Sequence, residues 1–145
     1  MNIPELITSL KSCGAKFYPA ASARDIDLAN SGLQARRRAM FPGILREFYA
    51  TTNAANLDSG YIFGPTETER GVNYPIPGIV QINDDFSRAM PDKSPYTIFG
   101  RNDLFFFAFD AFGTFYMLEN LNLRVLRKYE DGMRAISDCL MGGRL

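Results

Sequence analysis

The sequence predicts an α+β domain with a mostly antiparallel sheet of about five to six strands, on which N-terminal helices and a C-terminal helix pack. Apolar residues recur at helical spacing up to residue 53, and short apolar runs separated by turn residues follow from residue 61. Helical spacing returns after residue 130, so strands and helices do not alternate as in a doubly wound sheet. With 145 residues, the chain is expected to form a single domain spanning residues 1–145.

Three helices are expected before the first strand. Each is indicated by apolar side chains at helical spacing and by residues that favour helix ends, such as proline in a first turn or glycine after a last one. The first runs from Pro4 to Gly14, the second from Ser22 to about Asn30-Ser31-Gly32, and the third from Pro42 to Asn53. Ser22 followed by Asp25 resembles a capping box, which supports the start of the second helix.

Strands are expected where runs rich in Ile, Val, Phe and Tyr lie between turn residues. The expected strands are residues 61–63, 79–83, 96–100, 104–109, 114–118 and 123–129. The run 79–83 is assigned to a strand because its side chains alternate between two sides. Polar loops are expected at 65–78 and 84–95, and a helix is expected over residues 130–141.

The segment 104–118 is the most aromatic part of the chain, with six phenylalanines and a tyrosine. It is expected to form a hairpin in which Asp110 and Gly113 bound the turn and Phe109 pairs with Thr114. One face would then carry Phe105, Phe107, Phe109, Thr114, Tyr116 and Leu118. Both faces are apolar, so both must be covered. The N-terminal helices can cover one; the C-terminal helix, the 65–78 loop, another chain or a ligand can cover the second.

The charges of the chain balance overall, with 16 basic and 16 acidic residues. This balance argues against general binding to nucleic acid or to an anionic membrane. The charges are nevertheless uneven along the sequence: residues 1–46 carry seven basic and three acidic residues, whereas residues 47–100 carry three basic and seven acidic ones. An acidic face contributed by the middle third of the chain is therefore expected.

The composition is typical of a cytoplasmic protein. Cys13 and Cys139 are too few for a disulfide scaffold and wrongly spaced for a zinc site, so both are expected to be reduced thiols. The first residues lack the basic region of a signal peptide. No apolar run approaches the ~20 residues of a transmembrane helix, since Asp110 and Gly113 interrupt the aromatic segment.

The chain contains no histidine, which removes Ser-His-Asp and Cys-His nucleophile systems and histidine-containing metal sites. The glycines at 60–64 lack the Gly-Lys-Ser/Thr sequence of a phosphate-binding loop. Cys139 lies on an apolar helical face and is expected in the core. No catalytic residue, metal ligand or cofactor is therefore assigned, and the chain is expected not to be an enzyme.

Five acidic residues in expected loops form the candidate partner-binding site. They are Asp58, Glu67, Glu69, Asp84 and Asp85. Three roles are open for them: a solvated loop surface, a surface for a basic partner drawn from the 57–70 and 83–92 loops, and acid–base or divalent-metal chemistry, for which their spacing gives little support. The basic run at 36–38 is expected to be solvated or paired internally.

The order of these features resembles the SUKH superfamily, in particular its Smi/Knr-like branch. That family has a proline-led helix that ends at an asparagine before the first strand, and later an aromatic hairpin whose turn is marked by Asp and Gly. The matching helix residues are Phe41, Pro42, Leu45, Phe48, Tyr49 and Asn53. The matching hairpin residues are Gly100, Asp103, Phe105, Phe107, Asp110 and Gly113, and the resemblance covers residues 33–141.

The resemblance implies a non-enzymatic domain that binds proteins and makes no direct contact with nucleic acid. Bacterial members of the family are associated with immunity to polymorphic toxins, often nucleases, and fungal members act as interaction scaffolds in cell-wall signalling. This chain is accordingly expected to be an immunity protein that neutralises a toxin domain by direct binding. The alternative is an intracellular scaffold that forms homodimers through the apolar hairpin or an edge strand.

Overall fold

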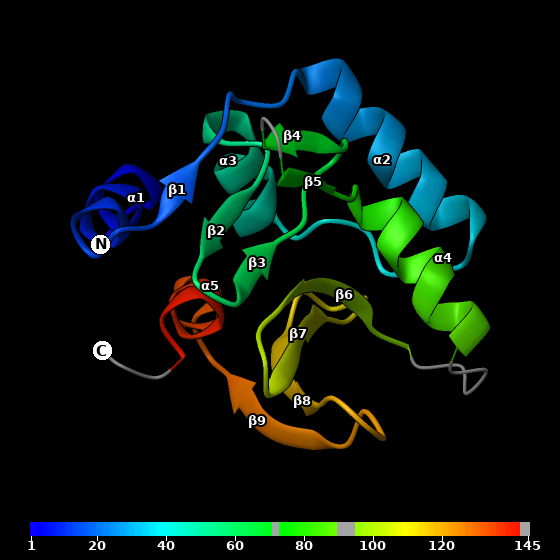
Figure 1. Cartoon of the computed structure of the whole chain (residues 1–145). Helices are drawn as coiled ribbons and strands as arrows, with labels where there is room; N and C mark the ends of the chain where they lie inside the picture. Colours follow the sequence, from blue (N-terminus) through cyan, green and yellow to red (C-terminus); the bar gives the residue numbers. More distant parts are fainter. Residues whose placement is uncertain (71–72, 90–94, 143–145) are drawn as a thin grey trace.

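The structure is a computed structural model, and it describes residues 1–70, 73–89 and 95–142. Within them it confirms the α+β class, with one seven-stranded sheet, a separate two-stranded hairpin and five helices (Figure 1). The helices are α1 (Ile3–Ser12), α2 (Ala23–Ala35), α3 (Gly43–Thr51), α4 (Ile79–Ala89) and α5 (Gly132–Met141). The strands are β1 (Lys16–Phe17), β2 (Ala55–Leu57), β3 (Gly60–Ile62), β4 (Thr68–Arg70), β5 (Asn73–Ile76), β6 (Thr97–Arg101), β7 (Phe105–Phe109), β8 (Phe115–Glu119) and β9 (Val125–Tyr129).

The three N-terminal helices form where the sequence predicts them, apart from one end. Asn2 and Ser22 cap α1 and α2, each accepting a hydrogen bond from the N–H three residues further on, at 2.9 and 3.1 Å. The predicted end of the second helix near residues 30–32 is wrong, because α2 continues to Ala35. Leu33 is fully buried, and the small Gly32 lets α2 lie close to α4. This tertiary packing stabilises the helix beyond the predicted end.

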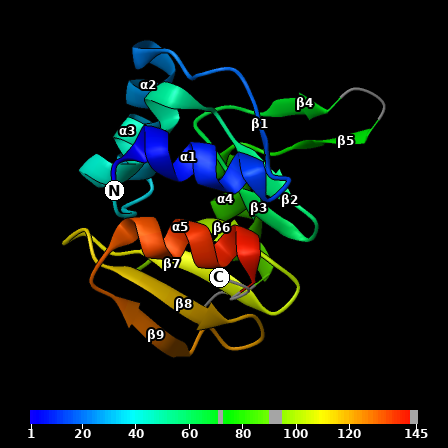
Figure 2. The same ribbon diagram turned by 90° about the vertical axis from the view of Figure 1, so that its left-hand side faces the viewer.

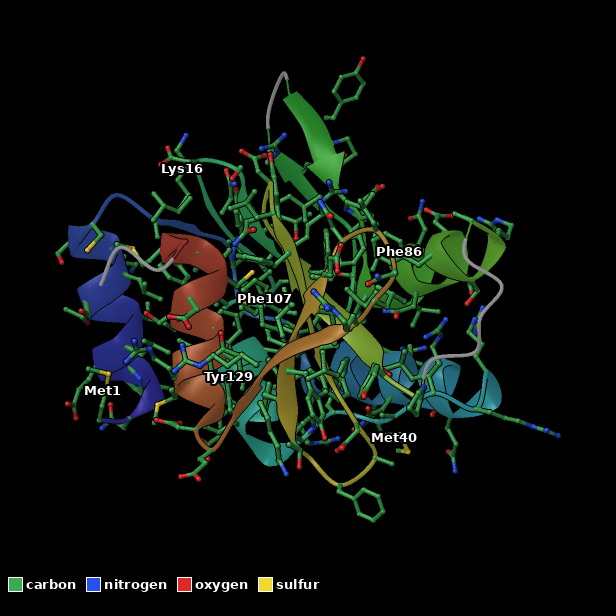
Figure 3. All side chains as sticks on the ribbon, turned by 90° about the horizontal axis from the view of Figure 1, so that it is seen from below. Met1, Lys16, Met40, Phe86, Phe107 and Tyr129 are labelled. Atoms are coloured by element: carbon green, nitrogen blue, oxygen red, sulfur yellow. The ribbon has the colours of Figure 1, made fainter. Side chains whose placement is uncertain are left out.

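The seven strands pair antiparallel in the order β1-β2-β3-β6-β7-β8-β9. Figure 1 shows α5 and α4 on opposite sides of β6, β7 and β8, and Figure 2 shows α1 running alongside α5. Phe107 and Tyr129 lie on the α5 side of the sheet, in the main core, whereas Phe86 lies on the other side (Figure 3). We call the face away from α5 the second face.

The hairpin forms, but its register differs by one residue from the predicted one. Phe109 pairs with Phe115 and not with Thr114. The reason is the turn: the Asp110 N–H donates to the Thr114 carbonyl at 3.0 Å, and Gly113 adopts a positive φ of 79°, so Asp110 and Thr114 close a three-residue loop. The shift turns every β8 side chain to the opposite face from the one predicted. The residues on the second face are Phe106, Ala108, Tyr116 and Leu118.

The cover of the second face comes from the segment predicted to be a strand and a loop. Residues 79–83, predicted as a strand, form the start of α4, and the predicted loop from residue 84 continues the same helix; residues 90–94 of that loop lie outside the described residues. Ile79, Asn83 and Phe86 face inward at helical spacing, and a five-residue window is too short to show that period. Phe86 packs on Phe106, with ring centroids 4.6 Å apart.

The predicted polar loop at 65–78 contains a second hairpin, formed by β4 and β5. Figure 2 shows this hairpin projecting from the rest of the molecule. Asn53 anchors its base, because the Asn53 side-chain amide donates to the Thr66 carbonyl at 2.8 Å and to the Thr68 hydroxyl.

None of the helices in the described ranges has the length and apolar character needed to span a bilayer.

Asn83 joins α4 to the sheet. Its side chain is fully buried and bonds both backbone groups of Ile98 on β6: it donates to the carbonyl at 2.8 Å and accepts from the N–H at 2.9 Å. A second donation, at 2.9 Å, reaches the Ile79 carbonyl one turn back in α4. One asparagine therefore fixes the position of the helix that covers the second face.

Asn83→Ala should lower the free energy of unfolding by about 2–4 kcal/mol, because the Ile98 N–H and carbonyl would be left buried without partners. Chemical denaturation measures this change. Gln81→Ala is the matched control: it lies exposed on the same helix and should change stability by less than about 0.5 kcal/mol. Equal stability of the two variants would contradict the role assigned to Asn83.

Candidate protein-binding surface

A groove of about 1090 Å³ lies at the end of the sheet where β7 turns into β8. Three stretches of the chain form most of it: residues 38–44, which end the α2–α3 connection and begin α3, residues 111–114 between β7 and β8, and residues 130–131 between β9 and α5. Figure 3 shows Met40 beside the β7–β8 turn. Three separate parts of the chain contribute to the groove.

Exposed apolar side chains border this groove. Phe112, at the tip of the β7–β8 turn, is 94% exposed, which is the highest value for a large apolar side chain in the described ranges. Met40 is 43% exposed, and Pro42 and Ile44 are partly exposed. We call these four residues the Phe112 patch. Because single exposed apolar residues are common but grouped ones beside a hollow are not, this patch is a candidate contact surface.

The turn that carries Phe112 is fixed by Asp110. One carboxylate oxygen accepts the backbone N–H groups of Phe112 at 2.9 Å and Thr114 at 3.0 Å, and the other accepts the Tyr116 hydroxyl at 2.8 Å. Partial burial by itself raises the pKa of Asp110, but these three hydrogen bonds, together with the charge of Lys128, hold it below its ordinary value. Phe112 is therefore presented to solvent on a rigid turn.

The structure does not bring the five predicted acidic residues together. Glu67 and Glu69 are exposed at the β4–β5 hairpin, and Asp58 is exposed in the β2–β3 turn with a positive φ of 51°. On α4, Asp84 pairs with Arg36 at 2.8 Å and Asp85 pairs with Arg88. These five residues therefore occupy three separate elements, and none of them lines the groove.

The basic run at 36–38, predicted to be solvated or paired internally, is largely used within the fold. Arg36 forms the ion pair with Asp84. Arg38 donates to the backbone carbonyls of Tyr96 at 3.0 Å and Asn83 at 3.2 Å, and also to the Ser87 hydroxyl. These contacts tie α4 and the start of β6 to the end of α2.

The described residues offer little reactive chemistry. They contain no group of three His, Cys, Asp or Glu side chains that could hold a metal ion. Cys139 is fully buried, as predicted, and its thiol lies 3.4 Å from the Tyr61 carbonyl and 3.6 Å from the Arg101 carbonyl. Burial raises the pKa of Cys139 far above its ordinary value, so the sulfur stays protonated and weakly nucleophilic.

The Phe112 patch is not among the sites predicted from the sequence, although the sequence contains one signal for it. Turn positions favour small and polar residues, so a phenylalanine between Ala111 and Gly113 is unusual. Met40 and Ile44 carried no such signal, since only the fold brings residues 38–44 next to the hairpin.

Comparison of the sequence with models of known protein families gives no match, and comparison with curated proteins gives none either. The resemblance to the SUKH superfamily therefore stays a prediction.

Asp110→Ala should lower the free energy of unfolding by about 1–3 kcal/mol, because two backbone N–H groups and one hydroxyl lose their acceptor. Thermal or chemical denaturation measures this, with the exposed Asp103→Ala as the control.

Asp110→Asn adds a pH test. The ionised carboxylate stabilises the fold above its ordinary pKa of about 3.9, and this contribution fades as the pH falls through the lower folded-state pKa. The difference in the free energy of unfolding between the wild type and Asp110→Asn should therefore become smaller as the pH falls. A difference that does not change with pH would contradict the role assigned to the Asp110 carboxylate.

Proposed function

We propose that this chain is a cytoplasmic protein-binding domain without catalytic activity, which binds its partner through the Phe112 patch. The observation that carries the proposal is Phe112 itself, 94% exposed on a turn held by Asp110 and placed beside a groove of about 1090 Å³. A rigid aromatic side chain loses little entropy on binding and removes a large apolar area from water.

The surroundings of the patch match the usual anatomy of a protein interface. Aromatic and apolar anchors at the centre supply most of the binding energy, and a polar rim excludes water from them. Here the apolar centre is bordered by Arg38, Lys128, Glu130 and Asp131, which also line the groove. These four side chains carry both signs of charge, so the rim would select a partner by complementary charges.

The partner we propose is a toxin domain that this chain neutralises by direct binding. The support is the resemblance of residues 33–141 to the SUKH superfamily, whose bacterial members have that role. Asp58, Glu67 and Glu69 are exposed and add negative charge outside the groove. If the toxin is a nuclease with a basic cleft, these charges would raise the rate of association more than the final affinity.

Phe112→Ser should weaken binding of the partner by about 2 kcal/mol or more, roughly thirtyfold, with little effect on stability because the side chain is already in water. Leu121→Ser is the matched control, since Leu121 is 80% exposed in the β8–β9 connection at the other end of the hairpin. The two variants and the wild type are immobilised and exposed to lysate of the native organism. We expect a protein retained by the wild type and Leu121→Ser but lost from Phe112→Ser.

The captured protein then tests the toxin proposal. Its expression in a heterologous host should stop growth, and co-expression of the wild type or Leu121→Ser, but not of Phe112→Ser, should restore it. Capture that does not depend on Phe112 would refute the binding surface, whereas Phe112-dependent capture of a harmless protein would refute only the toxin partner.

A homodimeric scaffold is the second candidate function. Its support is the outer edge of β9, the last strand of the sheet, where Val125 and Leu126 are 41% and 40% exposed. Strand edges of this kind can pair with another chain. Two copies joined there would, however, bring their basic residues Arg127 and Lys128 close together.

We therefore expect light scattering to give the mass of a monomer at high protein concentration and low salt. A dimer mass that returns to the monomer mass in Val125→Lys would instead favour the scaffold. Leu121→Lys adds the same charge away from this edge and serves as the control.

A further inference from the structure

A second cavity, of about 420 Å³, lies at the opposite end of β7 from the Phe112 patch. It opens between β3, the β5–α4 connection and the β6–β7 turn. Its apolar lining consists of Tyr61, Phe63, Pro75, Ile76, Pro77 and Ile82. This volume is within the usual range of small-molecule sites.

Two arginines line the same cavity, and each guanidinium lies over an aromatic ring. The Arg70 guanidinium carbon is 5.3 Å from the centre of the Tyr61 ring, and that of Arg101 is 5.7 Å from the centre of the Phe106 ring. Tyr61 and Arg101 are direct cross-strand partners of β3 and β6, so their side chains share the second face. A position over a ring restrains a guanidinium, and it leaves the N–H groups of Arg101 and the remaining N–H groups of Arg70 for a ligand.

Neither guanidinium is neutralised by a carboxylate of the described residues. Arg70 donates to the Tyr74 carbonyl at 2.8 Å and to the Tyr61 hydroxyl at 3.1 Å, both uncharged acceptors. By contrast, six other arginines among the described residues form ion pairs. Of the described residues that line the cavity, only Asp103 is acidic, and it forms no ion pair with either arginine. Two positive charges at one cavity favour an anionic ligand.

We propose that this cavity binds a carboxylate carried on an apolar group. The planar guanidinium edge matches a carboxylate in a two-point contact. The apolar lining would bury the apolar group that bears the carboxylate. Free inorganic anions have no such group. Asp103 at the rim would repel a second negative charge, so a monoanionic carboxylate fits better than a phosphate. The proposal is independent of the protein-binding function, because none of the cavity residues belongs to the Phe112 patch.

N-acetyl-L-leucine and its uncharged counterpart N-acetyl-L-leucinamide provide a direct test. Titration of each into the wild type at low salt, followed by NMR shifts or calorimetry, should show binding of the acid and at least about tenfold weaker binding of the amide. Added salt should weaken binding of the acid, since the site is open to water. A peptide that ends in leucine, with a free or an amidated C-terminus, forms the second arm. Tighter binding of the free-acid peptide than of the small acid would identify a protein C-terminus as the source, and equal binding would identify a small carboxylate.

Arg101→Gln should weaken binding of the acid by about tenfold. Arg101 is exposed, and its contact with the Phe106 ring adds little stability at an exposed site, so the variant should still fold. Arg70→Gln should weaken binding similarly, and Arg70→Lys should retain part of the affinity through its charge. Arg24→Gln, on the exposed surface of α2, removes the same charge away from the cavity and should bind like the wild type. Equal binding of acid and amide, absence of binding by either, or equal affinities of Arg101→Gln and Arg24→Gln would each overturn the proposal.

Discussion

The structure depends on the burial of both faces of the central strands. Phe107 and Phe109 of β7 are fully buried on one face, and Phe106 is 6% exposed on the other. An antiparallel strand with water on one side alternates apolar and polar residues, and β7 does not, so a cover is required on each face. α5 and the N-terminal helices supply one cover, and α4, joined to β6 by Asn83, supplies the other. The α4 segment is thus part of the core, although fewer of its residues are buried than in α5.

This two-sided burial leaves the ends of β7 as the places where the central strands meet solvent. The turn after β7 carries Phe112, and the turn before it, which includes Asp103, borders the cavity of Arg70 and Arg101. A five-residue strand separates its two ends by roughly 17 Å. The two candidate sites therefore share no lining residue and lie at opposite ends of the same strand.

Local pattern predicted most of the fold but not the relations between distant segments. The N-cap at Ser22 and the turn at Gly113 depend on neighbouring residues, so the sequence reveals them. Residues 79–83 show helical spacing only in the longer window that includes Phe86, and the hairpin register depends on the hydrogen bonds that close the turn between Asp110 and Thr114. The same limit explains the sites: Phe112 was visible as an unusual turn residue, whereas the shared cavity of Arg70 and Arg101 arises only when β3, β5 and β6 are assembled.

The buried polar groups of the described residues are all used by the fold, and no buried side-chain nitrogen or oxygen among them lacks a partner. Asp138 is 7% exposed and accepts from the Tyr129 hydroxyl at 2.8 Å and from Arg127 and Arg134. Burial, and then the bond to Asp138, raises the pKa of Tyr129, so the Tyr129 hydroxyl stays protonated near neutral pH. These contacts join α5 to β9 and stabilise that edge of the sheet. At the surface, by contrast, the ring of Phe112 is almost fully exposed, and neither Arg70 nor Arg101 pairs with a carboxylate of the described residues. A ligand can therefore contact these groups without breaking an ion pair of the fold.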